Sequence, residues 1–264
     1  MRRSFLAKPV WFPAGDRGVL LDLTGYAAQL DGLPAGDERQ VLTRTARQLG
    51  QLVAEKQNTA MFKGITDIVP GLASLLVHYD PLITTAAKIK AGISVLLDKM
   101  DMHQQTQIRL WTLPVHYAEQ NGPDIEEVAE HCQISVEEVI SLHCNTELEV
   151  GIMGFLPGLA YMTGLHPRLY LPRRSEPRTK VPGGTVAIAM DQTVIYPLDS
   201  PGGWNLIGAM PVPLFDARRP DPVLLKAGDK IAFRSVEWDE FTEIKALCQE
   251  GEMPLIPEYT DGQG

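Results

Sequence analysis

Residues 151–208 read GIMGFLPGLAYMTGLHPRLYLPRRSEPRTKVPGGTVAIAMDQTVIYPLDSPGGWNLIG, and this stretch is the most informative about the fold. It holds nine of the 23 glycines and seven of the 20 prolines of the chain. Such residues punctuate short β runs, which we place at 147–154, 185–190, 193–196 and 230–233. Because each run is close to the usual strand length, the pattern predicts a compact β-barrel, a closed or nearly closed antiparallel sheet.

A cationic cluster lies in the middle of the same stretch. Residues 168–180 contain five basic residues and one acidic residue, Glu176, so their local charge is +4 in a chain of net charge −9. The basic residues are Arg168, Arg173, Arg174, Arg178 and Lys180. Guanidinium groups bind carboxylate or phosphate through paired hydrogen bonds. The cluster is either a solvated basic loop or an anion site, and we favour an anion site built on Arg173, Arg174 and Arg178 because rigid proline turns coincide with the charge.

Two Pro-Gly-Gly steps, at 182–184 and 201–203, follow the cluster. They are either hairpin turns or exposed amides that contact phosphate or a developing oxyanion. The amides in question belong to Gly183, Gly184, Gly202 and Gly203. Nearby residues that would form a pocket wall are Phe155, Pro157, Tyr196 and Trp204, although Tyr196 and Trp204 also suit a core.

The remaining chemistry is sparse. We take His143 and Lys180 as the candidates for proton transfer. A nucleophilic pair of Cys144 with His143 is disfavoured, because adjacent residues on a helix diverge. The sequence lacks the HExxH, HxH and CxxC spacings, so no metal site is predicted. It also lacks the GxSxG, GxGxxG and GxxxxGK[ST] motifs of common hydrolases, dinucleotide enzymes and P-loop proteins.

The first third of the chain predicts a separate α/β layer. We expect strands at 19–23, 65–69 and 74–79 and helices at 37–56 and 81–97. This β-α-β-β-α order fits a ferredoxin-like domain, for which 107–115 is a candidate closing strand. A polar stretch at 101–105 sets the boundary, so the first domain comprises residues 1–105.

The rest of the chain is divided into a barrel domain, residues 106–236, and an acidic end, residues 237–264. The barrel domain should begin with two short helices, at 124–131 and 135–143, the second opened by a capping box. The acidic end holds eight acids and one lysine, which indicates a solvated helix and tail. The predicted fold class is therefore α+β.

Composition excludes several classes of protein. No apolar run approaches the roughly 18 residues of a membrane span, and residues 1–10 do not resemble a secretory signal. Three cysteines in no paired spacing suit a reducing compartment, so we expect a cytoplasmic protein. Basic residues form no stripe outside the cluster, which argues against nucleic-acid binding.

Taken together, the motifs resemble those of a bacterial family. They are GFLPG at 154–158, PRR at 172–174, PR at 177–178, VPG at 181–183, YP at 196–197, SPGGW at 200–204 and Gly208, with Gly15-Asp16, Tyr79-Asp80-Pro81 and Gly228-Asp229 outside that stretch. In order and spacing the chain resembles the family of 5-oxoprolinase B subunits, also called allophanate hydrolase subunit 1 or KipI-like. The similarity covers nearly the whole chain.

The resemblance implies a ferredoxin-like N-terminal domain followed by a cyclophilin-like β-barrel. It also implies two partners, the cyclophilin-like C subunit of 5-oxoprolinase and its A subunit. With them the family forms a hydrolase that uses ATP, with Mg²⁺, as a co-substrate to open 5-oxo-L-proline to L-glutamate; no tightly bound cofactor is expected. The glycines and arginines named above would hold phosphate or the substrate carboxylate.

The family also includes a sporulation regulator that inhibits a histidine kinase, and the module resembles the carboxyltransferase region of urea carboxylase. A regulatory binding module, or half of a urea-type carboxyltransferase or allophanate hydrolase complex, therefore remains an alternative. The chain departs from the family pattern at Leu159, Thr185 and Ala209-Met210. The departures at these positions bear on which amide the protein accepts as substrate.

Overall fold

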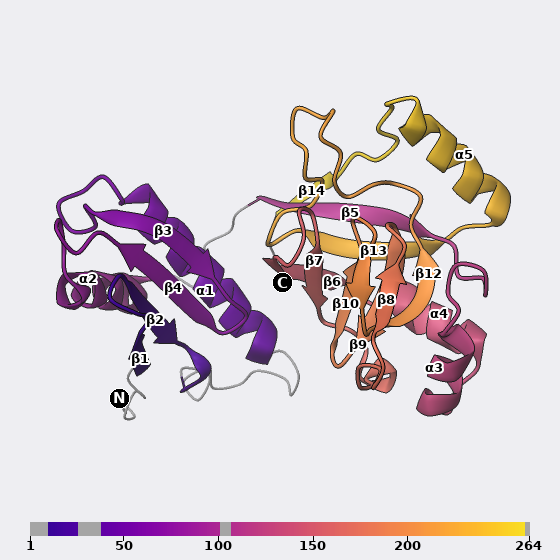
Figure 1. Cartoon of the computed structure of the whole chain (residues 1–264), viewed down its shortest axis with the longest axis horizontal. Helices are drawn as coiled ribbons and strands as arrows, with labels where there is room; N and C mark the ends of the chain where they lie inside the picture. Colours follow the sequence, from indigo (N-terminus) through magenta and orange to yellow (C-terminus); the bar gives the residue numbers. More distant parts are fainter. Residues whose placement is uncertain (1–9, 26–37, 101–106, 262–264) are drawn as a thin grey trace. The chain divides into compact units, whose positions relative to one another are not determined.

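The computed structural model describes residues 10–25, 38–100 and 107–261 of the chain (Figure 1). The chain divides into two compact units, residues 1–104 and 105–264, and each mixes helices with β-sheet. The predicted boundary at 101–105 and all but the last residue of the segment compared with a secretory signal fall outside the described residues.

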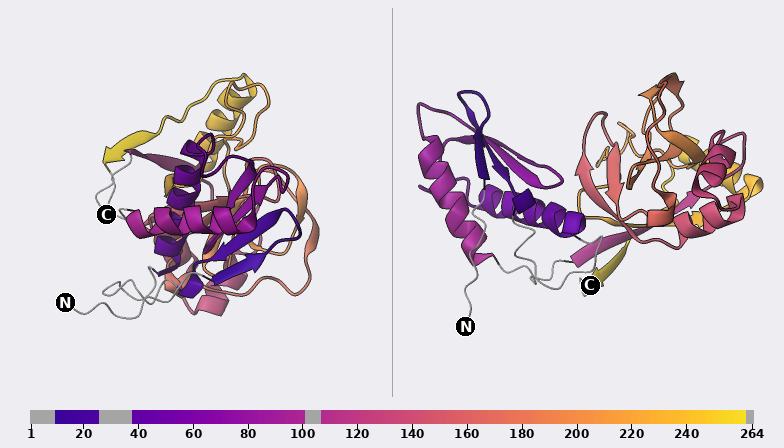
Figure 2. Two further views of the ribbon diagram at one scale, coloured as in Figure 1. Left: turned by 90° about the vertical axis from the view of Figure 1, so that its left-hand side faces the viewer. Right: turned by 90° about the horizontal axis from the view of Figure 1, so that it is seen from below.

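The first unit is a four-stranded antiparallel sheet covered by two helices. Its elements are β1 (Val10–Pro13), β2 (Gly18–Asp22), α1 (Glu38–Glu55), β3 (Ile65–Pro70), β4 (Ser74–Tyr79) and α2 (Ala86–Lys99), and the strand order is β1-β2-β4-β3. Alternate residues on the central strands, such as Leu21, Leu75 and Val77, are fully buried. The two helices contact each other and lie on one side of the sheet (Figure 2). This face forms the core of the unit.

The candidate closing strand belongs elsewhere. Residues 107–115 form β5 (Gln107–Val115), but β5 pairs within the sheet of the second unit. The place next to β2 is taken by β1, which the sequence analysis did not predict. A tight turn through Gly15, at a φ of 66°, joins the two strands as a hairpin. Glycine adopts this left-handed conformation without steric cost.

The second unit is built on an eight-stranded sheet, in the order β12-β9-β10-β7-β6-β13-β5-β14. Besides β5, these strands are β6 (Leu148–Met153), β7 (Ala160–Thr163), β9 (Thr185–Ala189), β10 (Gln192–Ile195), β12 (Asn205–Ala209), β13 (Lys230–Ser235) and β14 (Glu258–Asp261). A separate ribbon pairs β8 (Arg178–Val181) with β11 (Ser200–Gly202). The helices are α3 (Ile125–Cys132), α4 (Val136–Cys144) and α5 (Trp238–Gln249), with a 3-10 turn at Pro167–Leu169.

The sheet curls back on itself at the end of β5. His116 follows that strand and exchanges two backbone hydrogen bonds with Ala209 of β12, at 2.9 and 3.0 Å between N and O. Two strands that lie far apart in the sheet order therefore meet. The expectation of a purely antiparallel sheet is wrong, because β13 runs parallel to β5.

The acidic end is also more ordered than a solvated tail. Helix α5 buries Phe241, Ile244 and Cys248, and β14 adds a strand to the edge of β5. Asp239 and Glu243 on α5 and Glu258 on β14 are exposed, so the apolar positions of α5 decide its packing.

Candidate functional site

The arginines of the cationic cluster have different partners. Arg178 makes a two-pronged ion pair with Asp124, at 2.6 and 3.0 Å between nitrogen and oxygen. Arg174 binds the same carboxylate at 3.1 Å and Glu127 at 2.6 Å. The Asp124 side chain is 1% exposed. Two of the three arginines proposed for anion binding are thus paired with a buried carboxylate of the protein itself. Asp124 was not predicted as their partner from the sequence.

Arg173 is the exception. It has no carboxylate partner among the described residues, and it lines a pocket of about 240 Å³ in the second unit. The other lining residues are Phe155, Leu159, Tyr161, Val194, Tyr196, Pro201, Gly202 and Trp204. The predicted wall residues Phe155, Tyr196 and Trp204 therefore meet Arg173 in one place. We call this space the aromatic pocket.

The tyrosines of the aromatic pocket keep their protons. Burial raises the pKa of Tyr161 and of Tyr196, and the charge of Arg173 acts on both in the opposite direction. A phenol with a raised pKa stays neutral at physiological pH, so its hydroxyl remains a potential hydrogen-bond donor. The pocket combines one cation with two phenols and an apolar wall. This combination suits a small organic monoanion.

The predicted wall residues differ in exposure. Trp204 and Tyr196 are 6% and 3% exposed, and they pack with Leu159 and Val181 in a small core. Phe155 is 68% exposed and adopts a φ of 70°, a conformation that favours glycine. Pro157 is exposed and is not part of the pocket lining.

The first Pro-Gly-Gly turn does not offer free amides. The Gly183 N–H donates to the Asp199 carboxylate at 2.9 Å, and the Gly184 N–H donates to the Tyr196 carbonyl at 2.7 Å. An oxyanion site built on these two amides is therefore wrong for this conformation. The second turn instead borders the aromatic pocket, where Gly202 lies directly against Tyr196.

His143 is a core residue. Its Nδ1 lies 2.7 Å from the Tyr117 hydroxyl and its Nε2 lies 3.2 Å from the Thr193 hydroxyl, while its ring stacks on Phe233. The side chain is completely buried, which lowers the pKa of His143 to about 3. A neutral imidazole without access to solvent cannot exchange protons with a substrate. The structure thus gives His143 a packing role in place of the predicted proton transfer.

Lys180 does not suit proton abstraction either. Its Nζ lies 2.8 Å from Asp199, and this hydrogen bond raises the pKa of Lys180. An ammonium group with a raised pKa stays protonated at neutral pH. The pair is exposed, and its carboxylate also accepts from the Gly183 N–H of the first Pro-Gly-Gly turn.

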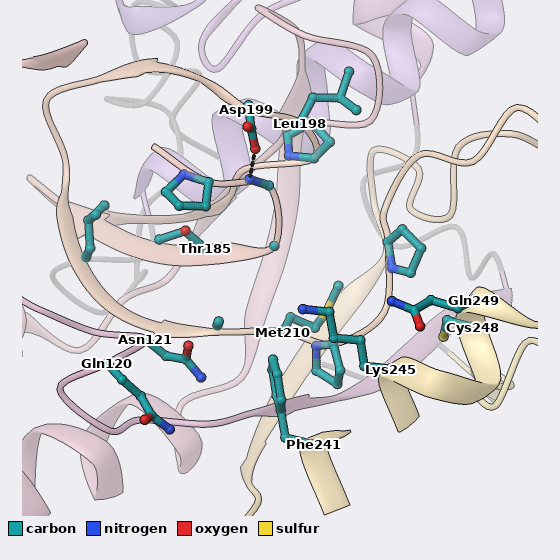
Figure 3. A pocket seen from close by; sticks show the side chains of 18 of the residues that line it. Gln120, Asn121, Thr185, Leu198, Asp199, Met210, Phe241, Lys245, Cys248 and Gln249 are labelled. Atoms are coloured by element: carbon teal, nitrogen blue, oxygen red, sulfur yellow. Dashed lines mark hydrogen bonds between the residues drawn. The ribbon is translucent and has the colours of Figure 1, made fainter. Parts of the chain in front are cut away.

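A larger cleft of about 820 Å³ is bordered by that turn. Phe241, Lys245 and Cys248 of α5 form one wall, and Leu198 and Asp199 lie across from them (Figure 3). The cleft also contains Gly183, Gly184 and two of the positions that depart from the family pattern, Thr185 and Ala209-Met210. Trp238 at its edge is 46% exposed and Leu198 is 41% exposed.

Metal centres and membrane spans each require a recognisable arrangement of residues. Within residues 10–25, 38–100 and 107–261, no group of three or more His, Cys, Asp or Glu side chains is arranged to hold a metal ion. In the same part of the chain, none of the helices has the length and apolar character needed to cross a bilayer.

Comparison with known proteins assigns the chain to a family. The family profile described as carboxyltransferase domain, subdomain C and D, matches residues 12–225. The chain is 36% identical over 194 residues to the B subunit of 5-oxoprolinase from Bacillus subtilis, in an alignment that covers 70% of this chain and 81% of the relative. It is 44% identical over 129 residues to the 5-oxoprolinase B subunit of Escherichia coli O157:H7, covering 49% and 59%.

Solved structures agree with this relationship. The crystal structure of TTHA0988 matches with a TM-score of 0.66 and 32% identity, over 84% of this chain and 40% of that chain. Kluyveromyces lactis urea carboxylase matches with a TM-score of 0.74 and 20% identity, over 98% of this chain and 25% of that chain, which shows a common fold. The chain thus belongs to the carboxyltransferase-domain C and D family. Within that family it groups with the proteins named as B subunits of 5-oxoprolinase.

Proposed function

We propose that this chain is a subunit of an ATP-dependent 5-oxoprolinase, which opens 5-oxo-L-proline to L-glutamate together with the A subunit of that enzyme and its cyclophilin-like C subunit. The relatives named as 5-oxoprolinase B subunits support the class of enzyme. The observation that supports a role for this chain in substrate binding is Arg173, a guanidinium without a carboxylate partner among the described residues, in an aromatic pocket.

The aromatic pocket suits the substrate rather than the nucleotide. Its volume of about 240 Å³ is below the range of roughly 300–1,000 Å³ for drug-sized ligands, so a single small ring fits and ATP does not. 5-Oxoproline is a five-membered lactam with one carboxylate. In this proposal the carboxylate pairs with Arg173, the ring packs on Trp204, and a phenol of Tyr161 or Tyr196 donates to the lactam.

The lactam amide of 5-oxoproline is too stable to hydrolyse unaided, so the proposed reaction first activates it with ATP. ATP transfers its γ-phosphoryl group to the lactam oxygen, so that a C–O–P linkage forms and ADP leaves. Water then attacks the activated ring carbon and the C–N bond breaks, which leaves a free amine and a γ-acyl phosphate. A second water molecule hydrolyses this acyl phosphate to the side-chain carboxylate of glutamate and inorganic phosphate. This chain orients the substrate, and the binding of ATP with Mg²⁺ is assigned to the complete complex.

We also propose a fold class for each unit. The first unit is assigned to the ferredoxin-like class, because β2, α1, β3, β4 and α2 follow its order and β1 occupies the position of the last strand. We assign the second unit to the cyclophilin-like barrels, on the basis of its curled sheet and the resemblance of its motifs. Cytoplasmic location belongs to the same proposal.

The test is substitution of Arg173 in the complete complex. The chain would be co-expressed with the A and C subunits, and 5-oxoproline-dependent ATP hydrolysis and glutamate formation would be measured. Loss of a charged hydrogen bond costs about 1.5–3 kcal/mol, so Arg173→Ala should raise the KM for 5-oxoproline about tenfold or more. Arg168→Ala is the matched control, because Arg168 pairs with Glu138 on the surface. An unchanged KM in the Arg173 variant would refute this role.

A second candidate is a regulatory binding module. The larger cleft favours it, because the exposed apolar side chains Leu198 and Trp238 at its edge suit contact with another protein. The same assay separates the two functions. No turnover with a complete set of subunits would favour regulation, whereas turnover that depends on Arg173 would support the enzyme.

A further inference from the structure

We propose that Asp124 is a positioning residue for the aromatic pocket. By binding Arg174 and Arg178 it keeps both out of the lining of the aromatic pocket, and it leaves Arg173 as the cation that meets the substrate. The inference rests on the proposed function for the identity of that substrate. The arrangement of the three arginines can be tested without it.

The Asp124 carboxylate has a full set of partners. Its Oδ1 accepts from Arg178 at 2.6 Å and from Arg174 at 3.1 Å, and its Oδ2 accepts from Arg178 at 3.0 Å and from the Leu206 N–H at 2.7 Å. The Asp124 N–H in turn donates to the Leu206 carbonyl at 3.0 Å. These bonds fix the carboxylate on β12 at the entrance of α3. A buried charge is stable only with such complete pairing.

The two arginines depend on Asp124 to different degrees. Arg174 has a second partner in Glu127, whose side chain is 64% exposed. Arg178 hydrogen-bonds through its side chain only to Asp124 among the described residues. Removing the Asp124 charge would therefore leave Arg178 without a partner, while Arg174 would retain an exposed one. The position of Arg178 is the more sensitive to Asp124.

Backbone hydrogen bonds connect the segment that carries Arg174 and Arg178 to the aromatic pocket. The Arg174 N–H donates to the Gly203 carbonyl at 2.8 Å, and Arg178 pairs with Gly202 in the β8–β11 ribbon. Residues 174–178 are thus held at both ends against the second Pro-Gly-Gly turn. Arg173 comes directly before the first of these attachments, and both Arg173 and Gly202 line the aromatic pocket. A shift of the attachments would move Arg173.

The consequence is selectivity by charge. Three arginines in one pocket would favour phosphate groups, which carry more negative charge than a carboxylate. Arg174 and Arg178 are paired with two carboxylates, Asp124 and Glu127, so the lining of the aromatic pocket presents one guanidinium among aromatic rings. This favours a monoanion, and in the proposed reaction it selects the carboxylate of the lactam over the phosphates of ATP.

Chemical modification of arginine tests the arrangement directly. The purified complex would be treated with phenylglyoxal, and the modified arginines would be located by peptide mass spectrometry. We expect Arg173 to react at least fivefold faster than Arg178 in the native protein, and Asp124→Asn to remove most of that difference. Equal rates for both arginines in the native protein would overturn the proposal.

Kinetics supply the second measurement. Asp124→Asn should raise the KM for 5-oxoproline about tenfold with a smaller change in kcat, whereas Glu127→Gln, the control on the exposed partner of Arg174, should change KM less than twofold. A native KM in a folded Asp124→Asn complex would also overturn the proposal. If Asp124→Asn fails to assemble, Arg178→Lys is the alternative variant, because lysine keeps the positive charge but cannot form the paired hydrogen bonds. It should raise the KM for 5-oxoproline severalfold, and an unchanged KM in this variant would also overturn the proposal.

The two proposals fail in different ways. If Arg173 is not the substrate ligand, 5-oxoproline will not protect it from phenylglyoxal and Arg173→Ala will not change KM. The difference in reactivity between Arg173 and Arg178, and its dependence on Asp124, would still be observed if Asp124 positions them. If both proposals hold, 5-oxoproline should protect Arg173 from phenylglyoxal in the native complex, and this protection should be weaker in the Asp124→Asn complex.

Discussion

His143 shows how a single buried residue couples stability to pH. Its imidazole lies against two hydroxyl groups and the Phe233 ring, which satisfy it in the neutral form. Burial lowers its pKa to about 3, from an ordinary value of 6.5. The folded protein keeps His143 neutral, whereas the unfolded chain binds a proton below about pH 6.5.

This residue predicts a loss of stability in weak acid. The contribution of neutral His143 is complete above the unfolded pKa and declines as pH falls from 6.5 towards 3. At pH 5 the loss is about 2 kcal/mol relative to pH 7. His143→Gln, which keeps hydrogen-bonding capacity but cannot titrate, should unfold in urea with a smaller difference between the two pH values. An equal difference in both proteins would show that other groups control the acid response.

At the scale of elements, the β8–β11 ribbon links the cationic cluster to the aromatic pocket. Gly202 of β11 has no room for a side chain, because a Cβ atom there would lie 2.2 Å from the Tyr196 hydroxyl. At the adjacent Gly203 the nearest atom would be 3.5 Å away, an ordinary contact. Tyr196 is 3% exposed, so it cannot move aside into solvent.

The adjacent glycines therefore provide a matched pair of variants. Gly202→Ala should displace Tyr196, destabilise the second unit by about 1–3 kcal/mol and raise the KM for 5-oxoproline. Gly203→Ala should have a much smaller effect on both. The measurements are thermal unfolding of the chain and steady-state kinetics of the complex. If the two variants behave alike, close packing on Tyr196 is not the reason for the glycine.

Sequence patterns were most informative where local chemistry decides the structure. β4 has the predicted bounds, and Ser135 of the predicted capping box accepts from the Glu138 N–H at the start of α4, while the Glu138 side chain binds Arg168. β1 was missed because its four residues, VWFP, are all apolar and show no alternation, although its partner β2 is the next strand in the chain. β12 was missed because its pairing depends on β9 and on His116. Dependence on distant residues also limits what the sequence predicts of the site. Arg173, Arg174 and Arg178 are equivalent in the sequence, and only Asp124, fifty residues away from Arg174, separates them.

At the scale of the whole molecule, the chain consists of two units with separate cores. The core of the first is built on Leu21, Leu49, Leu75 and Ile93, and the main core of the second on residues such as Leu113, Val150, Ile188 and Ile231. A unit with its own core and a complete set of strands is expected to fold alone. β5 decides where the second unit must begin, because it pairs with both β13 and β14.

Two fragments test this boundary. Residues 105–264 contain β5 and should unfold in a single cooperative transition in urea, with a far-ultraviolet spectrum rich in β structure. Residues 117–264 lack β5 and also His116, which joins the sheet to β12, so the edges of β12, β13 and β14 would be left unpaired. We expect this fragment to aggregate or to lose cooperative unfolding. Cooperative folding of the shorter fragment would show that the curled sheet of the second unit is stable without β5.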